Sequence, residues 1–112
     1  MDTELCIKEN SWIAQLAAKK LRSKNAAIVI RKTIYLYNVI IEDFLADTEW
    51  VKHEICHIRQ FEEYGFFRFI LMYLWESIKY GYHKNKFEVE ARNAGNNKQL
   101  FYSTYKIHLT PE

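Results

Sequence analysis

The pattern His-Glu-x-x-His at residues 53–57 constrains this chain more than any other feature of its sequence. Residues four apart on an α-helix lie on the same face, so the imidazoles of His53 and His57 would point the same way, with the Glu54 carboxylate beside them. Two imidazoles at this spacing are typical of a zinc site on a helix. The first hypothesis is therefore a metal site carried by a helix in the middle of the chain.

The residues that flank this pattern favour such a helix. Asp47 is a good N-cap, and Gly65 suits the position just after a helix, where glycine readily takes up a positive φ. We therefore predict a helix over residues 48–64, with both histidines near its middle. A second helix is predicted over residues 66–80, ending near Gly81, and its apolar residues cover so much of its circumference that we expect it to pack into the core.

Six further segments carry local signals of secondary structure. They are a helix at 11–23, two strands at 26–30 and 34–37, a helical turn at 41–45, a helix from Asn85 to Gly95 and a loosely alternating segment at 99–109 that we interpret as a strand. The two strands could also be one long bent strand, because the residues between them lack the Asn-Gly or Asp-Gly of a tight turn. With 112 residues and 49% hydrophobic residues, the chain suits one globular domain spanning residues 1–112. The aromatic residues expected in its core are Phe61, Phe66, Phe67, Phe69, Tyr73 and Trp75.

Charge and cysteine content exclude several classes of protein. The 16 basic and 14 acidic residues nearly balance, which gives no footprint for nucleic acid, and the basic residues at 19–24 are interpreted as a solvated helix face. Cys6 and Cys56 are too few for a disulfide framework and are interpreted as free thiols in a reducing compartment. The sequence shows no signal peptide, and the apolar run at 66–78 is too short and too charged to span a membrane, so we expect a cytoplasmic protein.

A catalytic zinc site needs three protein ligands and one open position, so a third ligand must come from elsewhere in the chain. Glu88 is the favoured candidate, because it opens the pattern E-x-x-A, in which the small Ala91 would let its helix approach the histidine helix closely. Glu90 would project from a different face of that helix. His83 is the second candidate, since imidazole is also a common zinc ligand, and His108 is the third.

The carboxylate inside the histidine pattern has a predicted chemical role. Zinc lowers the pKa of bound water toward 7, and a carboxylate within hydrogen-bond reach can accept the proton as the water attacks a carbonyl. Glu54 is therefore the predicted general base. Cys56 occupies a variable position of the pattern and is interpreted as a buried structural thiol, while Arg59 and Gln60 would at most line the rim of a cleft.

The segments WVKHEICHIRQF and NKFEVEAR resemble the gluzincins, the zincin-type metallopeptidases whose third ligand is a glutamate, and in particular small bacterial proteins of unknown function that keep a minimal core. The resemblance rests on H-E-x-x-H and E-x-x-A and extends over about residues 26–92. It implies an α+β fold with a minimal zincin-like core: a small β-sheet beside the histidine helix, further helices that carry the glutamate ligand, and one Zn²⁺ per chain. It also implies an edge strand, expected within residues 29–37, along which a peptide or protein substrate could bind in an extended conformation.

One residue behind the predicted ligands departs from the family pattern. Many members of the group carry an aspartate directly after E-x-x-A, which can support a metal-bound histidine, whereas this chain has Arg92 next to Ala91. If a carboxylate is needed there, Asp43, Asp47 or Glu90 would have to replace it.

The group that would stabilise an oxyanion is a second departure. Large gluzincins take a tyrosine or histidine from a second lobe for this purpose, and this chain is too short for such a lobe. Tyr80, Tyr82 and His83 precede the predicted ligand helix and are the candidates here, with a role as packing and loop residues equally open.

The leading hypothesis is a small zinc metallopeptidase with His53, His57 and Glu88 as ligands and Glu54 as base. Its alternative is a catalytically inactive zincin-like module that retains zinc for binding or structure. A third possibility is a metal-free helical interaction domain in which the histidine spacing is accidental. None of these readings calls for nucleic acid or a membrane span.

Overall fold

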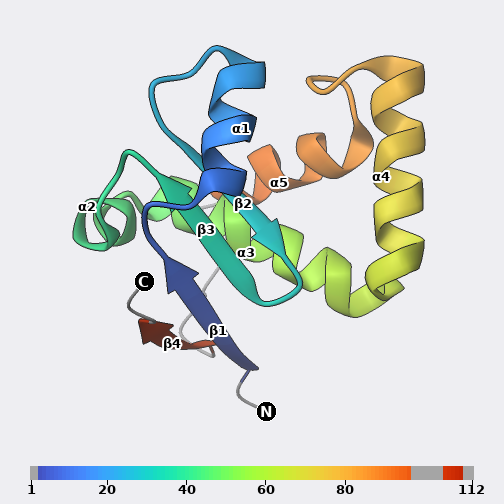
Figure 1. The fold of residues 1–112 in the computed structure, drawn as a ribbon. Coiled ribbons are helices and arrows are strands. Elements are labelled where there is room, and N and C mark those ends of the chain that lie inside the picture. Colours follow the sequence, from blue (N-terminus) through green and yellow to red (C-terminus); the bar gives the residue numbers. More distant parts are fainter. Residues whose placement is uncertain (1–2, 97–104, 110–112) are drawn as a thin grey trace.

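The computed structural model describes residues 3–96 and 105–109, which form an α+β arrangement of four strands and five helices (Figure 1). The elements in chain order are β1 (Thr3–Lys8), α1 (Trp12–Leu21), β2 (Ala26–Ile30), β3 (Thr33–Tyr37), α2 (Ile41–Ala46), α3 (Thr48–Tyr64), α4 (Phe66–Tyr80), α5 (Lys86–Asn96) and β4 (Tyr105–Leu109). None of the described helices is both long enough and apolar enough to cross a membrane.

The four strands form one mixed sheet in the order β2-β3-β1-β4. β1 runs parallel to both of its neighbours, whereas β2 pairs with β3 in an antiparallel hairpin that turns at Arg31, a residue with a φ of 58°. The register pairs Ile34 with both Val29 and Ile7, so these three side chains share one face of the sheet. The predicted edge strand at 29–37 is therefore right for its β2 part and wrong for β3, which lies inside the sheet.

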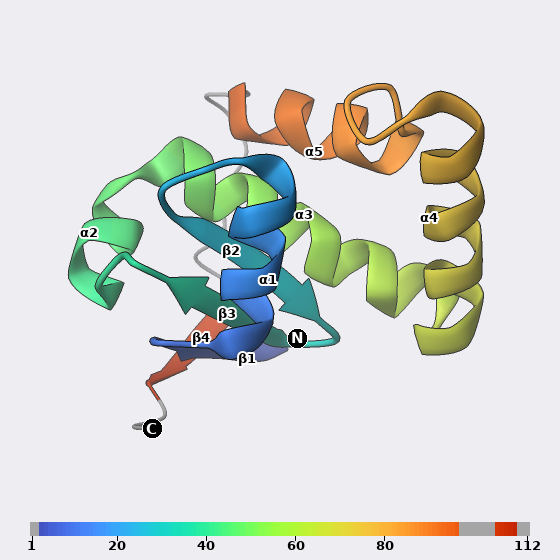
Figure 2. The same ribbon diagram turned by 45° about the horizontal axis from the view of Figure 1, so that its top comes forward.

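Two helices pack on the sheet from opposite sides, α1 on one face and α3 on the other (Figures 1 and 2). The buried residues of α1 are the small Ala14 and Ala18, which allow this helix to lie close to β2 and β3. The main core lies between the sheet and α3. Its fully buried side chains include Leu5, Ile7, Ile34, Leu36, Phe44, Val51, Ile55 and Ile58.

The ends of α3 and α4 follow the local signals of the sequence. The Asp47 side chain accepts a hydrogen bond of 3.1 Å from the backbone N–H of Trp50, which satisfies one free donor at the start of α3. Gly65 then ends α3 with a φ of 82°, and Gly81 ends α4 with a φ of 83°. The predicted bounds of both helices are confirmed. At the start of α1, the Ser11 side chain accepts a hydrogen bond of 3.3 Å from the backbone N–H of Ala14.

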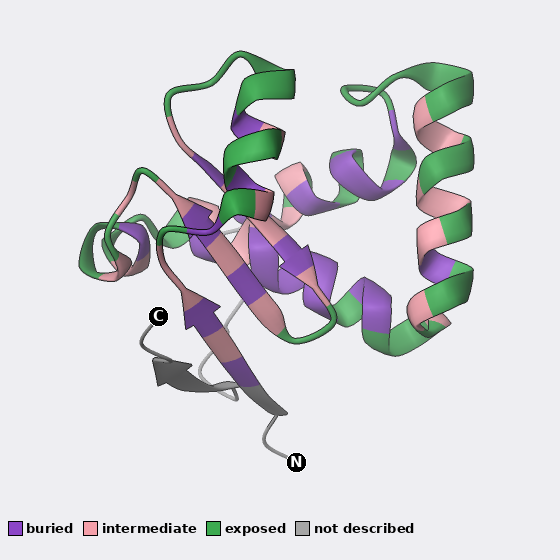
Figure 3. Cartoon of the chain, in the orientation of Figure 1, coloured by how far each residue is buried: buried purple, intermediate pink, exposed green. Residues whose placement is uncertain are grey.

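The predicted burial of α4 is wrong for most of its length. Only Phe69 is buried, and one side of the helix is exposed along its whole length (Figure 3). The large apolar side chains on that side are Phe67, Leu71, Leu74, Trp75 and Ile78. Apolar residues around a helix favour its burial, but no element in the described part of the chain packs against this side of α4.

β1 was not predicted, because TELCIK is short and carries charges, and its strand partners lie far away in the sequence. The strand predicted at 99–109 is confirmed for Tyr105–Leu109, while residues 97–104 lie outside the described part of the chain.

Candidate metal centre

The structure brings the predicted ligands together from two helices. His53 and His57 project from α3, and Glu88 projects from the first turn of α5. A single carboxylate oxygen, Glu88 Oε1, lies 3.2 Å from the Nε2 atom of each histidine. The three donor atoms all lie within 4.8 Å of one another, so this group could hold a metal ion.

The spacing and chemistry of these donors fit zinc. Ligand atoms 2.0–2.1 Å from a tetrahedral zinc ion lie about 3.3 Å apart, close to the two nitrogen-to-oxygen distances of 3.2 Å. Two imidazoles and a carboxylate are also a donor set that zinc accepts. His57 and Glu88 are buried, whereas the side chain of His53 keeps 20% of its accessible surface. The centre is therefore reachable from the side of His53.

Small residues allow α5 to lie directly against α3. Ala91 is completely buried, as expected from the E-x-x-A pattern. One turn later, a Cβ atom built on Gly95 would lie 2.8 Å from the backbone oxygen of Glu49 on α3. The prediction that α5 ends at Gly95 is wrong, because the helix continues to Asn96. Gly95 allows the close packing of α5 on α3 and does not end the helix.

Asn85, just before α5, connects the start of this helix to α4. Its Oδ1 accepts a hydrogen bond of 2.8 Å from the backbone N–H of Phe87, and its Nδ2 donates to the backbone oxygen of Tyr73 and to Ser77 Oγ at 3.0 and 2.9 Å. The residue is completely buried. These bonds fix the first turn of α5, and with it Glu88, relative to α4.

Glu54, the predicted general base, is buried next to the ligands. Its Oε2 accepts a hydrogen bond of 3.1 Å from Trp50 Nε1, one turn earlier on α3. Burial raises the pKa of Glu54 from its usual value to about 7, although the nearby histidines oppose this shift. A carboxyl group with such a pKa can take up and return a proton near neutral pH.

Glu88 is stabilised as a carboxylate by several donors. Burial alone would raise its pKa, but hydrogen bonds from His53, His57 and Tyr73 hold the pKa well below the usual range. Tyr73 donates to Oε2, the oxygen that the histidines leave free. Burial and the charge of Glu88 raise the pKa of Tyr82, whose hydroxyl also hydrogen-bonds Glu88. Burial lowers the pKa of His57, but its bond to Glu88 and the charge there prevail and raise the pKa to about 9.

Gln60 holds His57 from behind, which the sequence analysis did not predict. Its Oε1 lies 2.8 Å from His57 Nδ1, and its Nε2 donates to the backbone oxygen of Phe87 at 3.1 Å and to Glu90 Oε1 at 2.7 Å. Gln60 is buried rather than part of a cleft rim. The sequence does contain a signal for this contact, because Gln60 lies three residues after His57, on the same face of the helix.

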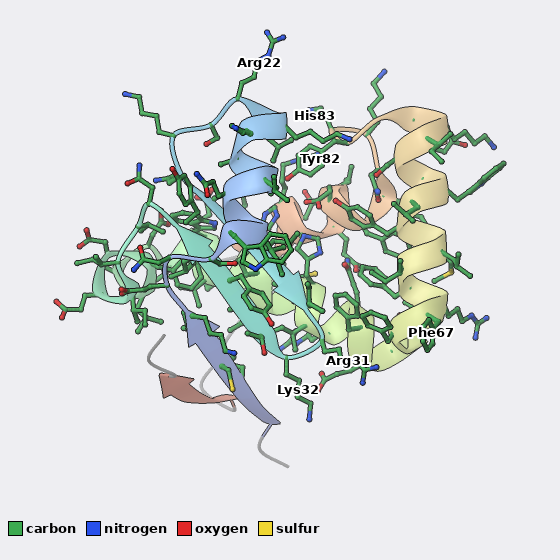
Figure 4. The ribbon with its side chains drawn as sticks, in the orientation of Figure 1. Arg22, Arg31, Lys32, Phe67, Tyr82 and His83 are labelled. Carbon is green, nitrogen blue, oxygen red and sulfur yellow. The ribbon has the colours of Figure 1, made fainter. Side chains whose placement is uncertain are left out.

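The structure separates the three candidates for an oxyanion-stabilising residue. Tyr82 and His83 lie in the connection between α4 and α5 (Figure 4). Tyr80 is exposed beside Lys79, and His83 is exposed, with its backbone oxygen accepting a hydrogen bond from Arg92. Only Tyr82 directs its hydroxyl toward the centre, and Tyr73 joins it from α4 as a residue that the sequence analysis assigned to the core.

The remaining predicted residues fall into distinct places. Asp43 is exposed on α2, Asp47 caps α3, and Glu90 contacts Gln60 instead of a histidine. Cys56 is buried 3.8 Å from Glu90, and burial raises its pKa to about 12, as suits a structural thiol. His108 lies in β4, and its side chain is outside the described part of the structure.

A groove of about 300 Å³ opens beside the centre, between α3 and α5. Trp50, His53 and Arg92 contribute to its wall. The most exposed of the three ligands therefore borders a space that a small group could enter.

Comparison of the chain with models of protein families, with curated proteins and with solved structures found no match. The resemblance to gluzincins thus stays a prediction from two short patterns.

Proposed function

We propose that this protein is a zinc-dependent metallopeptidase with a minimal zincin-like core. His53, His57 and Glu88 would hold one Zn²⁺ per chain, and Glu54 would act as general base. The observation that carries the proposal is the convergence of both imidazoles on Glu88 Oε1 at 3.2 Å, with the buried Glu54 next to them. A bound zinc ion would supply the activation of water and the polarisation of a peptide carbonyl.

The chain's own residues have separate tasks in this proposal. Glu54, with a pKa of about 7, would accept a proton at neutral pH and return it to the leaving amine. Tyr82 is the favoured donor to an oxyanion, because its hydroxyl reaches the centre while the residue as a whole stays 43% exposed. Tyr73 is buried deeper and would keep Glu88 in place through Oε2.

An extended peptide is the favoured substrate. β2 is an edge strand of the sheet and packs against α3, the helix of the histidines. Its free edge could pair with the backbone of a peptide as one more strand. The groove beside His53 could then receive one of the peptide's side chains.

The test compares the wild type with Glu54→Gln and Glu88→Ala, with the exposed Glu62→Gln on the same helix as a matched control. Each protein is loaded with zinc, its metal content is measured by elemental mass spectrometry, and hydrolysis is followed on a library of fluorogenic peptides. We expect Glu54→Gln to keep zinc and lose hydrolysis, Glu88→Ala to lose zinc, and Glu62→Gln to behave like the wild type. Full hydrolysis by Glu54→Gln would refute the assigned mechanism.

The alternative of an inactive module that retains zinc makes a different prediction. Structural zinc sites are closed by four protein ligands, whereas catalytic sites keep one position open. Within residues 3–96 the candidate group has three members, His53, His57 and Glu88. Tightly bound zinc with no turnover of any peptide would support the inactive module. A thermal stability unchanged by zinc or chelator would instead support the metal-free interaction domain.

A further inference from the structure

We propose that Gln60, held in place by Glu90 and by the backbone of α5, positions His57 by fixing which of its ring nitrogens carries the proton. The contacts of Gln60 give this inference, which rests on the proposed metal centre and extends it. Gln60 would be a positioning residue, since it touches neither the metal position nor the groove.

The hydrogen bonds of Gln60 determine the orientation of its amide. At one end of the amide, two groups that can only accept lie within reach: the backbone oxygen of Phe87 at 3.1 Å and the carboxylate of Glu90 at 2.7 Å. The NH₂ group must face them, because the reverse orientation would place three oxygens against one another. The amide oxygen must then face His57.

The orientation of the amide in turn determines the state of the imidazole. Gln60 Oε1 lies 2.8 Å from His57 Nδ1 and can only accept, so Nδ1 must carry a proton. Nε2, the atom that faces the metal position, also faces an acceptor, Glu88 Oε1, so without a metal it carries a proton as well. When a metal displaces that proton, Nδ1 keeps its own, and Nε2 is the nitrogen left to bind the metal. Both residues are buried, with His57 8% and Gln60 3% exposed, so water cannot easily replace the amide.

The same contacts give His57 a supporting group although Arg92 stands where an aspartate could support a metal-bound histidine. The Arg92 guanidinium turns outward and donates to the backbone of His83. Glu90 instead supplies the negative charge, one step removed from the histidine, through Gln60. Since Gln60 also bonds the backbone of Phe87, next to Glu88, one side chain orients a ligand on α3 and anchors the segment that carries the ligand on α5.

The test uses Gln60→Leu, which removes both the amide oxygen and the NH₂ group, and Gln60→Glu, which keeps an oxygen acceptor for His57. The exposed Glu63→Gln serves as the matched control. Zinc affinity is measured by competition with a chromophoric chelator. ¹⁵N NMR of the histidine side chains in the zinc-loaded protein shows which ring nitrogen binds zinc and which keeps a proton.

We expect the wild type, Gln60→Glu and Glu63→Gln to show His57 protonated at Nδ1 alone. Gln60→Leu should lose this preference and bind zinc about 10- to 100-fold more weakly, as is typical when a group behind a metal ligand is removed. A merely structural role would change stability but leave the nitrogen signals as they are. If Gln60→Leu does not fold, Gln60→Met gives the same readout, because it keeps the length of the side chain and removes the amide.

Two outcomes would overturn the inference. One is a Gln60→Leu protein that folds, keeps His57 protonated at Nδ1 and binds zinc within twofold of the wild type. The other is a zinc-loaded wild type in which Nε2 of His57 carries the proton and Nδ1 binds the metal. Both are independent of turnover: a protein that passes this test but hydrolyses no peptide would refute the proposed peptidase and leave the role of Gln60 standing.

Discussion

Replacing Gly95 with alanine should push α5 away from α3 and weaken the metal centre at the other end of α5. The added Cβ would lie 2.8 Å from the backbone oxygen of Glu49 and 3.1 Å from its Cγ, whereas ordinary contacts begin at 3.4 Å. The backbone oxygen cannot move aside within α3, so the helices must separate by about 0.6 Å, the difference between 3.4 and 2.8 Å.

The expected magnitudes follow from this displacement. Overpacking of this kind costs about 1–3 kcal/mol, against a gain of about 1 kcal/mol from the better helix propensity of alanine. We therefore expect a net loss of roughly 1 kcal/mol in the free energy of unfolding of the metal-free protein. Metal–ligand distances tolerate only about 0.2 Å, so a shift of Glu88 should also lower zinc affinity.

Urea denaturation of the metal-free protein and competition titration with zinc measure the two effects. Asn93→Ala is the matched control, since Asn93 is exposed on the same helix and its replacement improves propensity without a steric conflict. A Gly95→Ala protein that is as stable as the Asn93→Ala protein, with unchanged zinc affinity, would refute the close approach of the two helices as the reason for this glycine.

Three further outcomes are expected. Tyr73→Phe removes a donor to the Glu88 carboxylate, a kind of bond that contributes roughly 1.5–3 kcal/mol, so zinc affinity in a competition assay should fall about tenfold or more. Because the pKa of Glu54 is raised to about 7 in the folded protein, its ionisation opposes folding, and stability is lost as the pH rises from about 4.5 to 7. Metal-free Glu54→Gln should therefore gain stability relative to wild type between pH 5 and pH 8, and equal differences at the two pH values in urea titrations would contradict this. Since the pKa of His57 is raised to about 9, zinc binding at pH 7 should release about one proton, which calorimetry in buffers of different ionisation enthalpy measures. Zinc affinity should therefore rise with pH. Binding without proton release would count against Nε2 of His57 as a ligand.

Local signals explain which parts of the fold could be predicted. The cap at Asp47 and the glycines at 65 and 81 act on the backbone next to them, so the bounds of α3 and α4 could be derived from sequence alone. β1 could not, because its strand partners are Thr33–Tyr35 on one side and Tyr105–Leu109 on the other. Strand pairing over such separations leaves little trace in a six-residue segment.

The candidate site divides in the same way. His53 and His57 follow from one helix and a fixed spacing, and Glu88 follows from a second helix with a small residue one turn later. Gln60 and Tyr73 were assigned elsewhere, because Gln60 has partners 27 and 30 residues away and Tyr73 has one 15 residues away, and these meet only when α3, α4 and α5 are assembled. The spacing of three residues between His57 and Gln60 was the one local signal. The burial of α4 was misjudged for a related reason, because a stripe of apolar residues does not reveal whether another element covers it.

The placement of the ligands on α3 and α5 has a mechanical consequence. A metal ion that joins His57 to Glu88 would close a loop of 31 residues with all of α4 inside it. Closing a loop of that length with a covalent cross-link is worth on the order of 3–4 kcal/mol in lost chain entropy. The metal would thus act as a reversible cross-link. After chelation, the segment between residues 58 and 87 should be the first part of the described chain that an added protease cleaves.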